Sequence, residues 1–540
     1  MDEGQDSTDA ATARVSRRAL LAGSAALLAT GATGDRWAPR PQAGTGRPDD
    51  PFPTGGDDGS GADPQPRGAD AIRAENDRPG ATDWTIADGD ARPRGIEGFT
   101  DRVSVERGER VRLYVRSAAP TFRVLAYRMG FYAHRGARLV WTSDDEDVPD
   151  QPPATVDADT NMVDCSHWVP SLTIDVDSRW TPGQYLLKLV PSTGSETFVP
   201  LVVRDDDHAS DVLIVSDVTT VQAYNTWGGH SLYGDERGTR RRRATVVSFD
   251  RPYGQGWAQA GAILGDTFEV GMMCESMGLD VTYTTNIDQH ARPELMRRHR
   301  VIVSGAHDEY YSLEMRDGLE AARDEGVNIV FLGANAVYRR IRLDRSPLGP
   351  HRRQVNYRSA DADPLDGIDP ERVTTAWRES PARRPESALT GTYYESNEPG
   401  LSFPMVIVDP DAWMFAGTGV TAVGHQWPDA VREEYDRVTP SAPTPRRLQV
   451  LAHSPVVCQG RRSYADMTYY TVPSGAGVFS AGTLLFEPRL GPVPASPASD
   501  ADEPDAQVRR MMANILTEFA RGPAGRRRPA RPNLDRLDIA

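Results

Sequence analysis

The chain has 540 residues, of which 39% are hydrophobic and 26% are charged, and its formal net charge is -16. This composition is typical of a soluble globular protein long enough for two or three domains. The net negative charge disfavours nucleic acid or an anionic membrane surface as a partner. Three scattered cysteines, Cys165, Cys274 and Cys458, are too few for a disulfide framework or a zinc site.

The amino-terminal segment has the pattern of an export signal. Arg17 and Arg18 precede a run of small and apolar residues that continues to about Ala32. The apolar run is about a dozen residues long, against the roughly 20 that a spanning helix needs. The pattern predicts a twin-arginine signal peptide over residues 1–34, with a short membrane anchor as the alternative. We therefore expect export to the outside of the cell or the cell envelope, with no membrane span after signal cleavage.

Two segments of different texture follow the signal. Residues 35–80 are rich in Pro, Gly and Asp, which predicts a disordered linker. Residues 81–205 contain short runs that alternate apolar with polar side chains, such as Arg110–Arg116 and Phe122–Arg128, and Gly/Pro turns separate the runs. Period-two alternation with frequent turns predicts an antiparallel β-sandwich domain.

The rhythm changes again after residue 205. Apolar runs at Asp211–Ser216, Val301–Ser304 and Val327–Leu332 alternate with segments of helical spacing, such as Leu313–Arg323. Strands that alternate with helices of about ten residues indicate βαβ units. We therefore predict an α/β domain with a doubly wound, mostly parallel sheet over residues 206–521. The Gly/Pro/Arg-rich tail, residues 522–540, is expected to be disordered.

Polar side chains gather after three of the apolar runs of this second domain. Tyr224 and Asn225 follow the first run, His307 and Glu309 follow the second, and Asn335 follows the third. The carboxyl ends of parallel strands meet at one edge of a sheet, where ligands bind in α/β proteins. The three clusters are therefore predicted to share one edge. The segment 248–253, in the connection after the first strand, could fold over the same edge.

Four motifs in this order resemble the large (beta) subunit of N,N-dimethylformamidase, chiefly its C-terminal domain. The similarity runs from about residue 211 to 519 and extends weakly to residues 127–132. The motifs are Ala223-Tyr-Asn-Thr-Trp-Gly-Gly, Ser248-Phe-Asp-Arg-Pro-Tyr, Gly305-Ala-His-Asp-Glu-Tyr-Tyr-Ser and Phe331-Leu-Gly-Ala-Asn.

The resemblance implies a mononuclear ferric ion held by two tyrosinates and one glutamate. The glutamate matches Glu309, the first tyrosine matches Tyr224, and the second is assigned to Tyr253, with Tyr310 and Tyr311 as nearby alternatives. Phenolate and carboxylate are hard, anionic donors that suit a hard trivalent ion better than zinc or copper(I). Such an ion acts as a Lewis acid on a carbonyl group and on water.

The resemblance also implies catalytic groups beside the metal. His307 matches the histidine of the His-x-Glu motif and is expected to orient the nucleophile or to donate a proton. Glu434 is the candidate general base by its order in the chain only. Asn225 and Asn335 are candidates for donors to a carbonyl oxygen or to a metal ligand, and a turn role for Asn225 is the alternative.

Taken together, these patterns predict an exported, iron-dependent hydrolase of small amides or related non-peptide C–N bonds. The alternatives are a non-catalytic exported binding protein for carbohydrate or cell-wall material that retains the fold, and a hydrolase using another metal or an ester substrate. The expected partner is a small-molecule substrate, and a separate small subunit or a homo-oligomer is compatible with the resemblance. An export signal departs from the cytoplasmic role of the formamidase, which leaves the substrate open.

Overall fold

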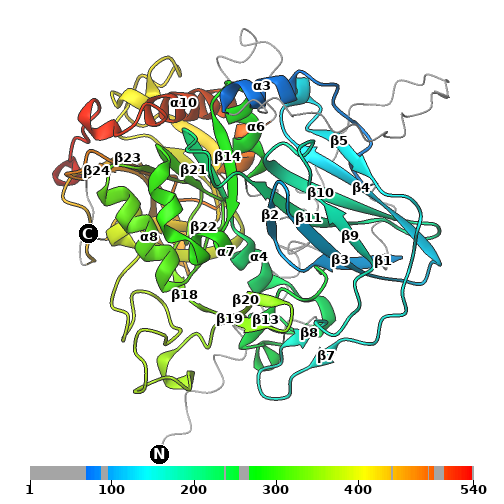
Figure 1. The fold of residues 1–540 in the computed structure, drawn as a ribbon. Coiled ribbons are helices and arrows are strands. Elements are labelled where there is room, and N and C mark those ends of the chain that lie inside the picture. The colour runs from blue at the N-terminus through cyan, green and yellow to red at the C-terminus, as the bar shows by residue number, and fades with distance from the viewer. Residues whose placement is uncertain are drawn as a thin grey trace, which may run out of the picture.

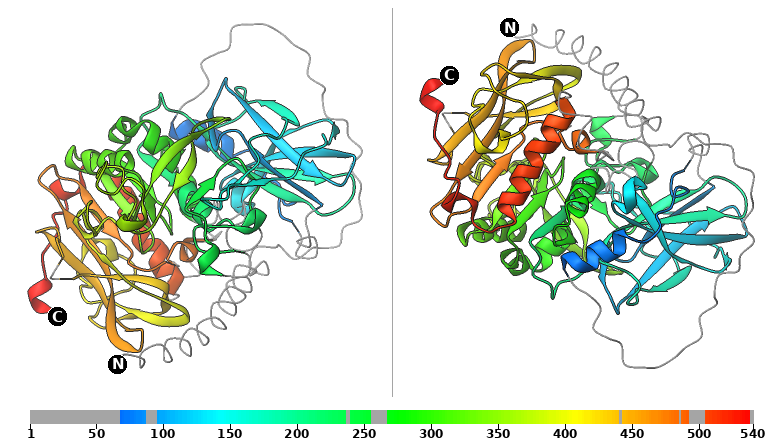
Figure 2. Two further views of the ribbon diagram at one scale, coloured as in Figure 1. Left: turned by 90° about the horizontal axis from the view of Figure 1, so that it is seen from below. Right: turned by 90° about the horizontal axis from the view of Figure 1, so that it is seen from above.

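The computed structural model describes residues 68–86, 95–235, 239–254, 267–439, 442–484, 486–491 and 504–537. The predicted signal peptide, residues 1–34, lies outside these ranges. Within them the protein is a mixed α/β structure with several sheets (Figure 1). The amino-terminal strands and the carboxyl-terminal strands lie at opposite ends of the molecule in both views of Figure 2. The α/β class predicted from the sequence is therefore confirmed.

The amino-terminal part contains two sheets that share one apolar core. A three-stranded sheet has the order β1-β3-β9, and a second sheet has the order β2-β11-β10-β4-β5, with β6 paired to β4. Side chains of both sheets pack together, among them Val111 and Leu113 from the first and Val124, Leu187 and Val199 from the second. The bounds of these strands are β1 Ile96–Thr100, β2 Ser104–Glu106, β3 Arg110–Ser117, β4 Thr121–Met129, β5 Ala137–Thr142, β6 Glu146–Asp147, β9 Leu172–Asp175, β10 Gly183–Pro191 and β11 Thr197–Arg204.

A seven-stranded sheet forms the centre of the second part. Its order is β14-β12-β15-β17-β25-β24-β23. The pairs from β14 to β25 are parallel, and the pairs made by β24 are antiparallel. The bounds are β12 Val212–Ser216, β14 Val281–Thr285, β15 Val301–Ser304, β17 Asn328–Phe331, β23 Leu448–Cys458, β24 Arg461–Thr471 and β25 Gly477–Ser480.

Successive side chains of the parallel strands enter two different apolar clusters. On β12, Ile214 packs in the cluster that contains helices α6 and α10, whereas Leu213 packs in the cluster that contains α8. Ser312 caps α8 by accepting a hydrogen bond from the Met315 amide, as expected for a serine before a helical run. The helices are α4 Val218–Tyr224, α6 Phe268–Ser276, α7 Asn286–Ala291, α8 Leu313–Asp324, α9 Ser387–Thr390 and α10 Pro504–Phe519.

Four smaller sheets complete the described structure. A long hairpin is formed by β21 (Tyr393–Val406) and β22 (Gln426–Arg437). A three-stranded sheet has the order β13-β20-β19, with bounds Val246–Ser248, Gly349–Val355 and Arg342–Ser346. The remaining pairs are β16 (Tyr310–Tyr311) with β18 (Arg339–Arg340) and β7 (Thr155–Val156) with β8 (Val163–Asp164).

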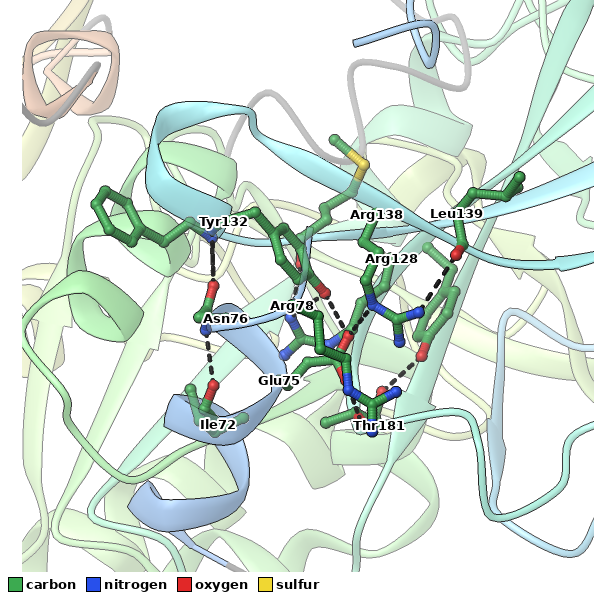
Figure 3. A network of polar contacts seen from close by, with 12 residues as sticks. Ile72, Glu75, Asn76, Arg78, Arg128, Tyr132, Arg138, Leu139 and Thr181 are labelled. Carbon is green, nitrogen blue, oxygen red and sulfur yellow. Dashed lines mark hydrogen bonds and ion pairs between the residues drawn. The ribbon is translucent and has the colours of Figure 1, made fainter. Parts of the chain in front are cut away.

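The interpretation of residues 35–80 as a linker is wrong at its carboxyl end, where helix α3 (Ala69–Asn76) forms. Glu75 of α3 is buried, and its carboxylate accepts hydrogen bonds from Arg138 at 2.6 Å, Tyr132 at 2.7 Å and Thr181 at 3.1 Å (Figure 3). Beside it, Arg128 donates to Glu275 at 2.7 Å, and both side chains are fully buried. Helix α3 is thus fixed by ion pairs that a polar composition did not reveal.

The interpretation of residues 522–540 as a disordered tail is also wrong for the residues described. Ala524 and Ala530 are buried in the large apolar cluster beside α10. The Asn533 side chain donates to the Val450 carbonyl at 2.9 Å and accepts from the Val450 amide at 2.8 Å. The described part of the tail therefore packs on the protein through its buried alanines and is joined to β23 by the hydrogen bonds of Asn533.

Candidate functional site

The three polar turns meet at one edge of the sheet, as predicted. Strand β15 pairs in parallel with β12 on one side and with β17 on the other. Helix α4, which ends at Tyr224, starts two residues after β12. His307 and Glu309 follow β15, and Asn335 follows β17. All of these side chains therefore come from neighbouring strands at their carboxyl ends.

A glycine allows two of these turns to touch. A Cβ atom at Gly333 would lie 1.5 Å from the carbonyl oxygen of Ala306. Only glycine has no Cβ, so only glycine permits this approach. The turn after β17 is consequently packed on the backbone of the turn that carries His307, and Asn335 is held in the left-handed region with φ 59°.

Glu309 is buried and surrounded by phenol groups. Its carboxylate accepts a hydrogen bond from the Tyr233 hydroxyl at 2.8 Å and lies 3.4 Å from the Tyr224 hydroxyl. The rings of Tyr224 and Tyr233 are stacked with centroids 3.9 Å apart. The Tyr310 hydroxyl donates to that of Tyr233 at 2.8 Å. The only ion pair of Glu309 with an arginine among the described residues is a long one, 3.5 Å from Arg339 Nε.

The protonation of this group depends on what binds there. Burial, followed by the charge of Glu309, raises the pKa of both Tyr224 and Tyr233 well above the usual range. Both side chains are therefore neutral phenols when no metal ion is bound. A cation at the three oxygens would reverse this preference, because it stabilises the phenolates and the carboxylate together. Among the described residues no group of three His, Cys, Asp or Glu side chains could hold a metal ion. Tyr224, Tyr233 and Glu309 are oxygen donors of a chemistry that fits a hard cation.

One ring nitrogen of His307 lies near two buried carboxylates. Its Nε2 atom is 3.7 Å from Glu309 and 3.5 Å from Glu434, which reaches the site from β22. Asn335 Nδ2 and Asn397 Nδ2 each donate to Glu434 at 2.8 Å. Burial acts to raise the pKa of Glu434, but the charge of His307 and these hydrogen bonds outweigh it, so the pKa lies below its usual range. Glu434 is therefore an ionised carboxylate that can accept a proton.

Asp308 stabilises the turn that carries His307 and Glu309. Its carboxylate accepts hydrogen bonds from Tyr311 at 2.6 Å, Ser304 at 2.7 Å and Asn286 at 3.2 Å. Burial raises the pKa of Asp308 to about 6 against the effect of these donors. Tyr311 thus stabilises the turn through its hydrogen bond to Asp308, and Tyr310 stabilises Tyr233 through the hydrogen bond between their hydroxyl groups.

Asn225 and Tyr253 occupy the neighbouring loop. The Asn225 side chain accepts from the Gly254 amide at 2.8 Å and donates to the Pro252 carbonyl at 3.0 Å. Tyr253 packs with Val218, and burial raises the pKa of Tyr253 to about 12. This geometry gives Asn225 a positioning role for the loop that carries Tyr253. The tyrosine that the structure places beside Tyr224 is Tyr233, which sequence reasoning missed because the irregular segment that carries it has no periodicity or motif.

The fold and the site define a mixed α/β protein with a buried cluster of tyrosines, carboxylates and a histidine at the carboxyl edge of parallel strands. The sequence matches the family described as N,N-dimethylformamidase beta subunit-like, C-terminal, over residues 123–500, and the chain belongs to this family. The match starts within β4, so it includes more of the amino-terminal strands than the motifs indicated. No curated protein matches the chain. Among the described residues no helix is long and apolar enough to cross a membrane.

Proposed function

We propose that the protein is a metal-dependent hydrolase of small amides or related C–N bonds. The observation that carries this proposal is the convergence of Tyr224, Tyr233, Glu309 and Glu434 beside His307. Family membership supports it, because the name of the family refers to an enzyme that hydrolyses a formamide. The ion would be a single ferric ion held by Tyr224, Glu309 and a second tyrosine. Bound there, it would supply Lewis acidity to a carbonyl oxygen and to water.

The chain's own residues would move the proton. Glu434 is ionised and held by two amide donors, so it can take a proton from the attacking water as the new C–O bond forms. His307, 3.5 Å from Glu434 Oε2, is placed to deliver a proton to the nitrogen as the C–N bond breaks. The Oδ1 atom of Asn335 is buried and accepts no hydrogen bond within the described structure. It can accept one from a substrate N–H.

The domain arrangement that we infer follows the sequence prediction. The amino-terminal sheets, within residues 81–205, would form a β-sandwich, and residues 206–521 would form the doubly wound domain that holds the metal. The shared apolar core of the amino-terminal sheets and the parallel pairing of β12, β14, β15, β17 and β25 support this division. The family match crosses residue 205, which indicates that the two parts form one functional unit.

Iron uptake and a visible spectrum test the metal site before any substrate is known. We expect about one ferric ion per chain and a tyrosinate-to-iron absorption band. Tyr224→Phe should abolish the band, whereas Tyr233→Phe and Tyr253→Phe form a matched pair that identifies the second ligand. A colourless protein that takes up no iron, yet hydrolyses amides at the same rate, would overturn the metal-dependent mechanism. A colourless protein without hydrolytic activity would favour a binding protein.

We further propose that the chain is exported by the twin-arginine pathway. The support is the Arg17-Arg18 pair before a short apolar run. Changing both residues to lysine in the full chain should leave the protein inside the cell, and cell fractionation measures this. Unchanged export of the double variant would contradict the signal.

A further inference from the structure

Three arginines gather beside the tyrosine cluster. The Arg358 guanidinium lies 4.1 Å from the centre of the Tyr233 ring, and that of Arg339 lies 4.6 Å from the centre of the Tyr338 ring. Burial, and then the charges of Arg358 and Arg339, lower the pKa of Arg243. The three side chains therefore experience one another's charge. We call Arg243, Arg339 and Arg358 the arginine cluster.

The arginine cluster carries more positive charge than its surroundings offset. Within the described ranges, the one carboxylate in ion-pair reach is Glu309, 3.5 Å from Arg339 Nε. Arg243 donates to the Tyr357 carbonyl at 3.3 Å, and Arg358 donates to the Tyr310 hydroxyl at 3.5 Å, so both meet neutral oxygens. In the proposed function the charge of Glu309 would be shared with a metal ion, which leaves the excess larger still.

Two of the guanidinium groups also have poorly satisfied donors. The Nε atoms of Arg339 and Arg358 are buried and make no hydrogen bond within the described structure, and Arg339 Nε has only the long 3.5 Å ion pair with Glu309. A buried, unsatisfied charged donor is costly, because it loses water without gaining a partner. Arg358 also has φ 72°, in the left-handed region that a non-glycine residue rarely adopts. In the other buried polar cluster, by contrast, Arg128 is paired with Glu275. These features indicate that the arginine cluster is arranged for a partner from outside the chain.

We propose that the substrate of this site carries a carboxylate near the scissile C–N bond, and that Arg339 and Arg358 bind it. Guanidinium groups form planar, charge-assisted hydrogen bonds that suit a carboxylate. Arg243 would add attraction without direct contact. The inference rests on the proposed function, since it places the reacting amide at the neighbouring tyrosine cluster. It sets this protein apart from a hydrolase of neutral formamides.

A matched pair of ligands tests the inference. N-Formylglycine and N-formylglycinamide differ only in the carboxylate, and calorimetric titration of metal-free and iron-loaded protein measures both. We expect the acid to bind about 10–100-fold more tightly than the amide, as a charge-assisted pair gives. Arg358→Gln should remove most of this preference, and Arg358→Lys should restore part of it. Arg342→Gln is the control, because Arg342 is already paired with Asp363 at 2.7 Å.

Equal affinity for the acid and the amide would overturn the inference. So would an acid preference that survives in Arg358→Gln, or binding of inorganic phosphate as tightly as the acid, which would reveal a general anion site. Failure of iron uptake, by contrast, bears on the proposed function. The acid preference of the metal-free protein depends only on the arginines, so the two failures are distinguishable.

Discussion

Two buried polar clusters of this protein stabilise the negative charge of their carboxylates in different ways. Glu75 meets Arg138 at 2.6 Å (Figure 3), and Glu275 meets Arg128 at 2.7 Å, so each carboxylate has an arginine partner. Around Glu309 and Glu434, the carboxylates meet phenols, amides and a histidine, and the nearest arginine nitrogen is 3.5 Å away. The first cluster is neutralised internally and holds α3 in place. The second is incompletely neutralised, which is typical of sites built to bind or to react.

The largest effect is expected at Glu434, the proposed general base. Glu434→Gln keeps the shape of the side chain but removes its ability to accept a proton. The catalytic rate should fall by about 10²–10⁴-fold, the usual contribution of a general base, with iron content and thermal stability unchanged. Glu433→Gln is the control, because Glu433 is also a buried glutamate and is the immediate neighbour of the candidate base in the sequence. A full rate in Glu434→Gln would contradict this role, and the rate is measured on whichever amide the protein hydrolyses.

The neutralised cluster should respond through stability instead. Glu275→Ala leaves Arg128 buried without its partner, and the free energy of unfolding should fall by about 3–5 kcal/mol. Urea denaturation measures this loss. The double variant Arg128→Met/Glu275→Leu replaces the pair by apolar side chains and should be nearly neutral. If Glu275→Ala is no less stable than this double variant, the cluster is not held by its ion pair.

Asp436, next to the candidate site, provides a further test of the difference between the two clusters. The quantity measured is the free energy of unfolding as a function of pH. Burial raises the pKa of Asp436 to about 6 against hydrogen bonds from the Asn335 amide and Thr392. In the unfolded chain the Asp436 carboxyl loses its proton near pH 4, whereas in the folded protein it loses it at about pH 6. Between these two pH values the folded state therefore binds more protons than the unfolded state. The free energy of unfolding should therefore fall as pH rises from about 4 to 6, by up to about 3 kcal/mol.

Asp436→Asn should remove this pH dependence, because an amide can accept from Asn335 without a charge. Urea denaturation across that range, with the exposed Asp317→Asn as control, measures the effect. An unaltered pH profile in Asp436→Asn would assign the titration to another group.

Much of the fold was predictable because apolar periodicity reports burial directly. The β15 strand begins at Val301 and the α8 helix at Leu313, where the sequence pattern placed them. Helix α3 and the tail were missed, since their composition is polar. Their stability comes from a few long-range contacts, such as Glu75 with Arg138 and Asn533 with Val450.

The residues of the candidate site likewise include some that the sequence could predict and some that it could not. His307, Glu309 and Tyr224 were predicted as site residues because polar residues directly follow buried strands, and the structure brings these three together. Glu434 had only its order in the chain, and the long hairpin that brings it to within 3.5 Å of His307 could not be inferred from periodicity. Tyr233 depends on the path of an irregular loop, which local sequence does not determine. The pattern of apolar and polar residues does not show which turns, distant in the sequence, contact one another in the fold.

Metal-linked stability tests the central claim most directly. Glu309→Gln removes a buried charge that phenols surround, so without metal the variant should be at least as stable as the wild-type protein. Ferric iron at 100 times its dissociation constant should stabilise the wild-type protein by about 2.7 kcal/mol and leave Glu309→Gln unchanged. Iron-dependent unfolding of the two proteins measures this reversal. If Glu309→Gln is destabilised as strongly as Glu275→Ala, and iron shifts neither protein, Glu309 belongs to a structural cluster and the metal site does not exist.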